Sequence, residues 1–190
     1  KLEKSIRIVC QKHDNFKIKL KIKDGEIFQE FTNDKENIEF INLANEKEFE
    51  KFRIKTIKKT FDLESQLYKF YIIKFENGKG AFLLNIHHLI SDAWTLALIC
   101  NDIIKTYSKL INNQEIETKS IYSYIDYIKS EKEYHKSEKY KIDKNYWLEK
   151  YKTIPEVATI PGSKQNEANI SSVIGERKQF KIEQEQVNKI

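Results

Sequence analysis

Long apolar runs, methionine and paired cysteines are missing from this sequence of 190 residues. The longest apolar stretch, Ala93 to Cys100, is far shorter than the roughly 20 residues that a membrane helix needs, so no membrane partner is expected. Lys1 to Cys10 alternates charged and apolar residues like a helix of a mature protein, which argues against a secretion signal. Without an initiator methionine, and with helical patterns at both ends, the sequence is expected to be a fragment of a longer protein.

The two cysteines, Cys10 and Cys100, each lie in an apolar helical pattern. Their separation matches neither a disulfide framework nor the clustered spacing of a metal site. Thiols of this kind are typical of a reducing compartment. A cytoplasmic location, with no bound metal, is therefore the expectation.

Arginine is scarce as well. Of the 34 basic residues only Arg7, Arg53 and Arg177 are arginines, which leaves 31 lysines, and the formal net charge is +5. Proteins that bind nucleic acids favour arginine, because its planar guanidinium forms bidentate hydrogen bonds to bases and phosphates. Here the basic residues are mostly lysines, and they are interspersed with 29 acidic residues. The sequence predicts a solvated, lysine-rich surface and no nucleic-acid partner, although that surface suits an acidic or phosphate-bearing one.

Apolar residues make up 39% of the chain, enough for one sizeable core. They recur at helical spacing over 1–12, 46–60, 94–111, 122–134, 138–151 and 183–190, and they alternate over 16–22, 27–31, 38–43, 67–75, 81–88 and 172–182. Turn residues at 23–26 and 77–80 predict two hairpins, and residues 162–172 have a loop-like composition. The pattern predicts an α+β fold, a mixed β-sheet flanked by helices, with one sheet and no internal domain boundary.

Two of these segments are expected to lie deep in the molecule. Residues 81–88 are apolar on both faces, which predicts an inner strand that is covered on both sides. The helix over residues 94–111 is apolar nearly all round in its first two turns and amphipathic later. It is expected to be buried at its start and exposed at its end.

The segment His87-His88-Leu89-Ile90-Ser91-Asp92-Ala93-Trp94 joins that strand to that helix, a place where catalytic groups are often found. Histidine suits proton transfer near neutral pH because its ordinary pKa is about 6.5. Alternation along a strand would put His88 on the face of Ile86 and His87 on the opposite face. Only one of the two histidines could then point into a cleft.

Spacing alone leaves other interpretations open. Asp92 could cap the following helix or pair with a cation, and the two histidines could be satisfied polar groups of the core. A metal site formed by His87, His88 and Asp92 is disfavoured, because adjacent strand residues diverge and no third His or Cys is clustered with them.

The segment from His87 to Trp94 resembles the HHxxxDG signature of condensation domains of nonribosomal peptide synthetases and their acyltransferase relatives. Four other segments resemble family motifs, in the same order: Lys12 to Leu20 (RHExLRTRF), Phe61 to Glu64 (FDL), Ser123 to Tyr127 (YxDY) and Tyr146 to Tyr151 (YWxxxL). Gly175 and the residues after it look like the family's crossing strand.

The resemblance implies a fold of two similar halves, each like chloramphenicol acetyltransferase, with the active site between them. Residues 1–190 would be the N-terminal subdomain, without the first motif and without the C-terminal subdomain, which would be its structural partner. The resemblance also implies that His88 is the catalytic residue, while His87 orients it and Asp92 holds the motif loop.

In that family the reaction is amide formation between two substrates carried on phosphopantetheine arms of donor and acceptor carrier proteins. The chain itself would bind no cofactor. Two departures from the motifs stand out: Ala93 replaces the signature glycine, and Lys17 replaces an arginine. The alternatives are another HHxxxDG acyltransferase that acts on a small free alcohol or amine, and a non-catalytic, condensation-like docking module.

Overall fold

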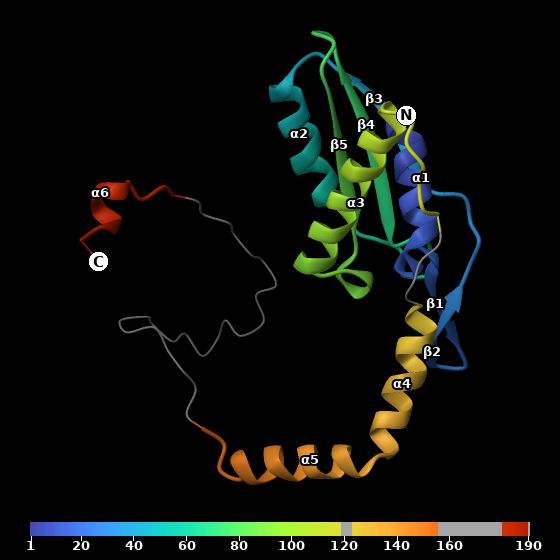
Figure 1. Cartoon of the computed structure of the whole chain (residues 1–190), viewed down its shortest axis with the longest axis vertical. Coiled ribbons are helices and arrows are strands. Elements are labelled where there is room, and N and C mark those ends of the chain that lie inside the picture. The colour runs from blue at the N-terminus through green and yellow to red at the C-terminus, as the bar shows by residue number, and fades with distance from the viewer. Residues whose placement is uncertain (119–122, 156–179, 190) are drawn as a thin grey trace. The chain divides into compact units, whose positions relative to one another are not determined.

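The computed structural model of the chain describes residues 1–118, 123–155 and 180–189. They form two compact units, Lys1–Ser137 and Glu138–Ile190, a division that the sequence pattern did not predict. The first unit (Figure 1) contains α1 Leu2–Lys12, the 3-10 helix η1 Asp14–Lys17, β1 Ile18–Lys23, β2 Glu26–Phe31, β3 Ile38–Leu43, α2 Glu46–Ile57, β4 Tyr68–Phe75, β5 Gly80–Ile86, the 3-10 helix η2 His88–Ile90, α3 Ala93–Ile111 and α4 Tyr124–Lys136. The second contains α5 Glu138–Lys150 and α6 Gln184–Val187.

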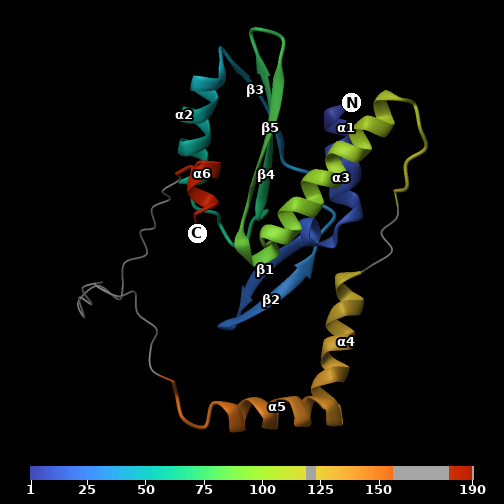
Figure 2. The ribbon, with the colours of Figure 1, turned by 60° about the vertical axis from the view of Figure 1, so that its left-hand side comes forward.

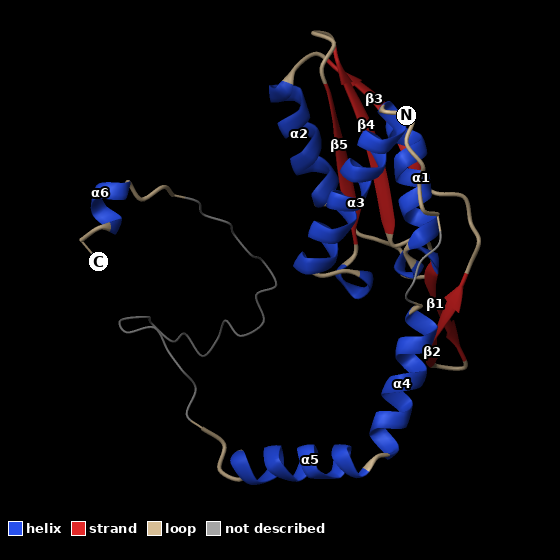
Figure 3. Ribbon diagram, in the orientation of Figure 1, coloured by secondary structure: helices blue, strands red, loops and turns tan. Residues whose placement is uncertain are grey.

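The central sheet of the first unit has three strands in the order β3-β4-β5. β3 runs parallel to β4, and β4 runs antiparallel to β5, so the sheet is mixed. Helix α2 covers one face, while α1 and α3 lie side by side on the other (Figures 2 and 3). The predicted α+β class, a mixed sheet flanked by helices, is confirmed.

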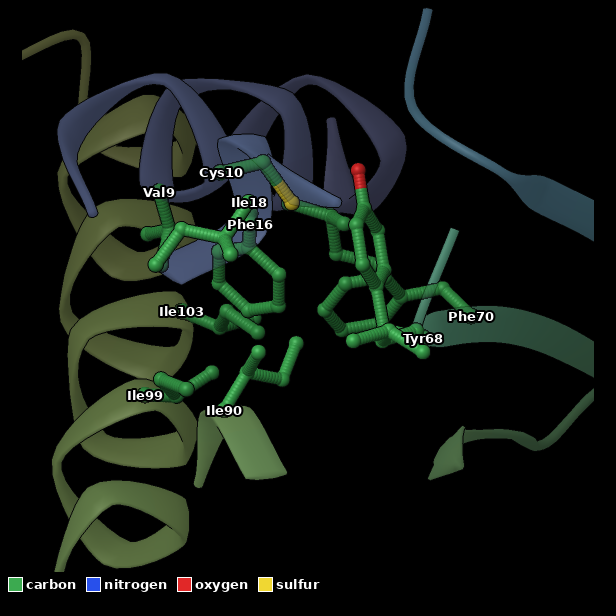
Figure 4. Packing of buried hydrophobic residues seen from close by; sticks show 11 residues of the cluster. Val9, Cys10, Phe16, Ile18, Tyr68, Phe70, Ile90, Ile99 and Ile103 are labelled. Carbon is green, nitrogen blue, oxygen red and sulfur yellow. The ribbon is translucent and has the colours of Figure 1, made fainter. Parts of the chain in front are cut away.

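Apolar side chains of β4 point to both faces of the sheet, so helices can pack on either side of it. Tyr68 and Phe70 belong to a buried cluster that includes Val9 of α1 and Ile99 and Ile103 of α3 (Figure 4). On the opposite face of the sheet, Tyr71, Ile73 and Phe75 of β4 form a second cluster, and Phe49 and Phe52 of α2 pack against it. Both faces of the sheet are therefore part of the core.

The prediction that residues 81–88 form an inner strand is wrong. β5 ends at Ile86 and lies at the edge of the three-stranded sheet in the described part of the chain, and β4 is the inner strand. A strand that is apolar on both sides needs cover over both faces, which the helices supply. That pattern carries no information on whether both edges have a neighbouring strand.

The prediction of a single sheet is also wrong, because β1 and β2 pair only with each other. Phe16, predicted as the first strand residue, lies instead in η1. The turn between the strands follows the expected chemistry: Asp24 and Gly25 both have positive φ, 53° and 81°, as a type I′ hairpin turn requires. Both predicted hairpins are confirmed, because β1 pairs with β2 and β4 pairs with β5, each antiparallel.

Helix α3 is not buried at its start, contrary to prediction. Trp94 is 73% exposed and Leu98 is 45% exposed, whereas Ile99 and Ile103 are fully buried. A helix that is apolar all round does not reveal which of its faces has a partner. In the described structure, α1 and the sheet pack against the face of α3 that carries Ile99 and Ile103. The face with Trp94 and Leu98 stays exposed.

The predicted strand over 172–182 falls largely outside the described residues, as do Gly175 and the predicted loop at 162–172. Phe180 to Ile182 is described and has no strand. The helix predicted from residue 183 is present as α6, Gln184–Val187. Within the described residues, every helix is too short or too polar to cross a lipid bilayer.

Candidate active site

A short turn, His87 to Ser91, connects β5 to the N-cap of α3, and we call it the motif turn. The backbone N–H of His87 donates to the carbonyl of Leu67 at 2.8 Å, and the chain then enters η2. The strand therefore stops one residue before the first histidine. The expected alternation of faces does not extend to His87 and His88.

His87 makes hydrogen bonds within the motif turn and a ring contact with Phe61 outside it. Its Nδ1 accepts a hydrogen bond from the backbone N–H of Leu89 at 3.1 Å. Its carbonyl accepts one from the hydroxyl of Ser91 at 3.1 Å. Its ring meets Phe61 edge-on, with centroids 5.7 Å apart. These contacts fix the His87 ring, and Phe61 is a neighbour that sequence spacing alone did not place there.

His88, the first residue of η2, is exposed. Within the described part of the chain its ring forms no hydrogen bond, and Leu89 beside it is 59% exposed. The prediction that His88 shares a face with Ile86 is wrong, because Ile86 packs against the core cluster. The 3-10 turn rotates the chain after the strand ends, and His88 points to solvent.

Asp92 caps helix α3, which selects one of the two alternatives left open by the sequence. Its Oδ1 accepts hydrogen bonds from the backbone N–H and from the hydroxyl of Thr95, both at 2.7 Å. The Thr95 hydroxyl, followed by the Thr95 N–H and the charge of His88, lowers the pKa of Asp92. The carboxylate is therefore the form that holds the helix start below the motif turn.

Ala93, at the glycine position of the signature, causes no backbone conflict. It is the first residue of α3, and among the described non-glycine residues only Asp24 and Asn113 have positive φ. The left-handed conformation that would favour glycine is not required here.

The segment that resembles RHExLRTRF links several elements through side chains. Lys17, the second departure, pairs with Asp14 at 3.0 Å. Asp14 in turn accepts the backbone N–H of Tyr124 at 3.0 Å, at the start of α4. Asn15 donates from Nδ2 to the carbonyl of Ile90, inside the motif turn, at 3.0 Å. This last contact was not predictable from the sequence, because no spacing rule relates residues 75 positions apart.

The contacts of Asp14 predict that the attachment of α4 to η1 is sensitive to acid. Burial opposes its ionisation, but hydrogen bonds from Lys17 and from the Tyr124 amide outweigh burial and lower the pKa of Asp14. Its stabilising contribution is therefore present above the unfolded pKa of about 3.9 and is lost as the pH falls through the lower folded pKa. Asp14→Asn should weaken this pH dependence and speed hydrogen exchange at the Tyr124 amide. Urea unfolding between pH 2.5 and 6 checks the pH dependence of stability, and hydrogen-exchange mass spectrometry checks the Tyr124 amide. A pH profile of stability that is the same in Asp14→Asn and the wild type would contradict the prediction.

The surface around His88 is open. A cavity of about 170 Å³ lies elsewhere, lined by none of the residues 87–95 and including Cys10, Glu36 and Tyr68. Burial raises the pKa of the Cys10 thiol, which suits a packed side chain rather than a nucleophile. Among residues 1–118, 123–155 and 180–189, no group of three or more His, Cys, Asp or Glu side chains is arranged to hold a metal ion.

Comparison with known proteins identifies the family. The family model described as the condensation domain matches residues 1–190. Surfactin synthase subunit 1 of Bacillus subtilis (strain 168) is 26% identical over 191 residues, covering 93% of this chain and 5% of that protein. Bacitracin synthase 3 of Bacillus licheniformis is 23% identical over 193 residues, covering 100% of this chain and 3% of that protein. The chain thus spans a twentieth or less of these relatives.

Two solved structures with a similar fold are a condensation domain and an epimerization domain. The starter condensation domain of the rhizomide synthetase RzmA aligns with a TM-score of 0.73 and 16% identity, over 82% of this chain and 41% of that one. The epimerization domain from the third module of tyrocidine synthetase B aligns with a TM-score of 0.66 and 23% identity, over 84% and 39%. At such identities the likeness establishes the fold, and the fold agrees with the family match. The chain belongs to the condensation domain family.

Proposed function

We propose that the chain is the N-terminal half of a condensation domain whose parent enzyme forms an amide bond between two carrier-bound substrates. The observation that carries the proposal is the exposed ring of His88 on a short, internally bonded turn, in a chain of this family. The chain matches about two fifths of the solved domains, which supports a half-domain. A C-terminal subdomain would supply the other wall of the site.

In this proposal the acceptor amine attacks the carbonyl carbon of the donor thioester. A C–N bond forms and the C–S bond breaks, so the acyl group moves to the acceptor and the donor arm is released as a thiol. Neutral His88 accepts the proton from the attacking nitrogen or hydrogen-bonds the developing tetrahedral centre, and the proton ends on the departing sulfur. His87 and Asp92 hold the motif turn. Alignment of the two reactants supplies much of the acceleration.

Both substrates would arrive on phosphopantetheine arms of a donor and an acceptor carrier protein. The chain would present His88 to them and would hold no cofactor or metal of its own. Because His88 lies on an open surface here, the 190-residue chain alone is not expected to align carbonyl and amine.

The test compares the intact parent enzyme with this chain alone. Each is incubated with donor and acceptor carrier proteins loaded with the amino acids that the parent's own module activates, and the acceptor arm is analysed by mass spectrometry. The parent should produce an amide-linked product on the acceptor arm, and the chain alone should give none above background. Inversion of a carrier-bound amino acid without a new amide would instead assign epimerisation.

The same assay separates the remaining alternatives. Acylation of a small free amine or alcohol, with no product on the acceptor arm, would identify another HHxxxDG acyltransferase. Carrier binding without any turnover would identify a docking module. Either result would overturn the proposed condensation activity.

A further inference from the structure

The motif turn is tied to the rest of the chain at both of its ends. At its start the N–H of His87 bonds to Leu67, and near its end the carbonyl of Ile90 accepts from Asn15. The other hydrogen bonds of the turn that involve His87, Leu89 and Ser91 are internal to it. In the described structure, Asn15 is therefore the only side chain outside the turn that donates to the turn backbone.

The Asn15 bond anchors the last peptide group of the turn, whose own N–H, that of Ser91, reaches the His88 carbonyl at the long distance of 3.5 Å. The side chain of Ile90 is 9% exposed and packs in the core near Phe16, Ile99 and Ile103 (Figure 4). This packing fixes the position of Ile90 but not the orientation of the peptide group that follows. The amide of Asn15 fixes that orientation, because a carbonyl prefers its donor near its own plane.

His88 depends on this backbone. Its ring has no hydrogen bond within the described residues, so the backbone of the turn is what sets the direction of its Cα–Cβ bond and the place from which the ring extends. Residue 88 lies two positions before the carbonyl that Asn15 holds. A rotation of the turn would move the ring, and misplacement of a reacting group by about 1 Å can slow an enzyme roughly a hundredfold.

We infer that Asn15 is a positioning residue for His88: its side-chain amide holds the Ile90 carbonyl and thereby sets the orientation of the motif turn. The inference rests on the proposed role of His88. The contact is part-buried, and water can replace Asn15 at the carbonyl when the side chain is removed. Loss of Asn15 should therefore affect the chemical step more than the stability of the fold.

The test is a double-mutant cycle in the intact parent enzyme. Single-turnover amide formation is measured with donor carrier preloaded by the parent's own adenylation domain, for the wild type, Asn15→Ala, His88→Ala and the double variant. Asn15→Ala should lower the maximal rate by about tenfold or more. The acceptor-carrier concentration at half-maximal rate should change less than twofold. In the His88→Ala background, Asn15→Ala should have no further effect, because the ring that it positions is gone.

Two comparisons make the result decisive. Asn33→Ala removes an exposed asparagine side chain that makes no hydrogen bond to a described residue, and it should retain the wild-type rate. Asn15→Asp, an isostere without the N–H donor, should be as slow as Asn15→Ala, and it replaces that variant if the alanine protein does not fold. Wild-type rates in the Asn15 variants, or equal losses with and without His88, would overturn the inference. A wild-type rate in His88→Ala alone would instead overturn the proposed function.

Discussion

Replacing His88 with alanine in the intact parent enzyme is expected to slow amide formation by roughly ten- to ten-thousand-fold, the range for a positioned acid–base group. The melting temperature should stay close to that of the wild type. The His88 ring is exposed and makes no hydrogen bond to a described residue, so its removal costs few folded-state contacts. A large loss of rate without a loss of stability distinguishes a catalytic side chain from a structural one.

Single-turnover rates and thermal melting curves, measured on the same preparations, check this result. His135→Ala is the matched control, because it makes the same substitution at a histidine of α4, outside the motif turn. It should leave the rate of amide formation unchanged. If His88→Ala instead lowers the melting temperature strongly and still condenses at the parent's rate, His88 is a structural residue and the proposed mechanism is wrong.

Replacing Phe70 with alanine is expected to destabilise the fold by about 3–5 kcal/mol, the usual cost of truncating a buried aromatic residue. Phe70 is fully buried in the inner strand, and its ring lies 5.8 Å from that of Phe16 and 6.0 Å from that of Tyr68. The cavity would open beneath η1, the segment that carries Asn15. Such a loss is a large fraction of the roughly 5–15 kcal/mol by which a domain is normally stable.

Phe40→Ala provides the comparison on the same sheet. Phe40 lies in β3 and is 62% exposed, so the same substitution removes little buried surface and should cost less than about 1 kcal/mol. Urea unfolding of the 190-residue chain, followed by circular dichroism, gives both free energies. Equal losses for the two variants would show that Phe70 is not at the centre of the core.

The motif turn shows how far sequence reasoning reaches at the candidate site. The signature pointed to His87, His88 and Asp92, and the cap formed by Asp92 was one of two alternatives derived from its place before a helix. The direction of His88 was not predictable, because it depends on whether the strand ends at Ile86 or continues for two more residues. β5 ends at Ile86, opposite Tyr68 at the start of β4, and the last hydrogen bond between the two segments joins His87 to Leu67. Where this pairing ends is a property of the folded sheet.

By itself the sequence determined what is local: the helices and strands of the first unit to within a few residues, and the Asp24-Gly25 hairpin turn. These depend on backbone geometry and hydrogen bonds that act over only a few residues. Only the tertiary structure decided that β4 and not β5 is the inner strand, and which face of α3 is buried. The same holds for Asn15 and Ile90, because contacts between distant residues arise from the packing of whole elements, which no local pattern encodes.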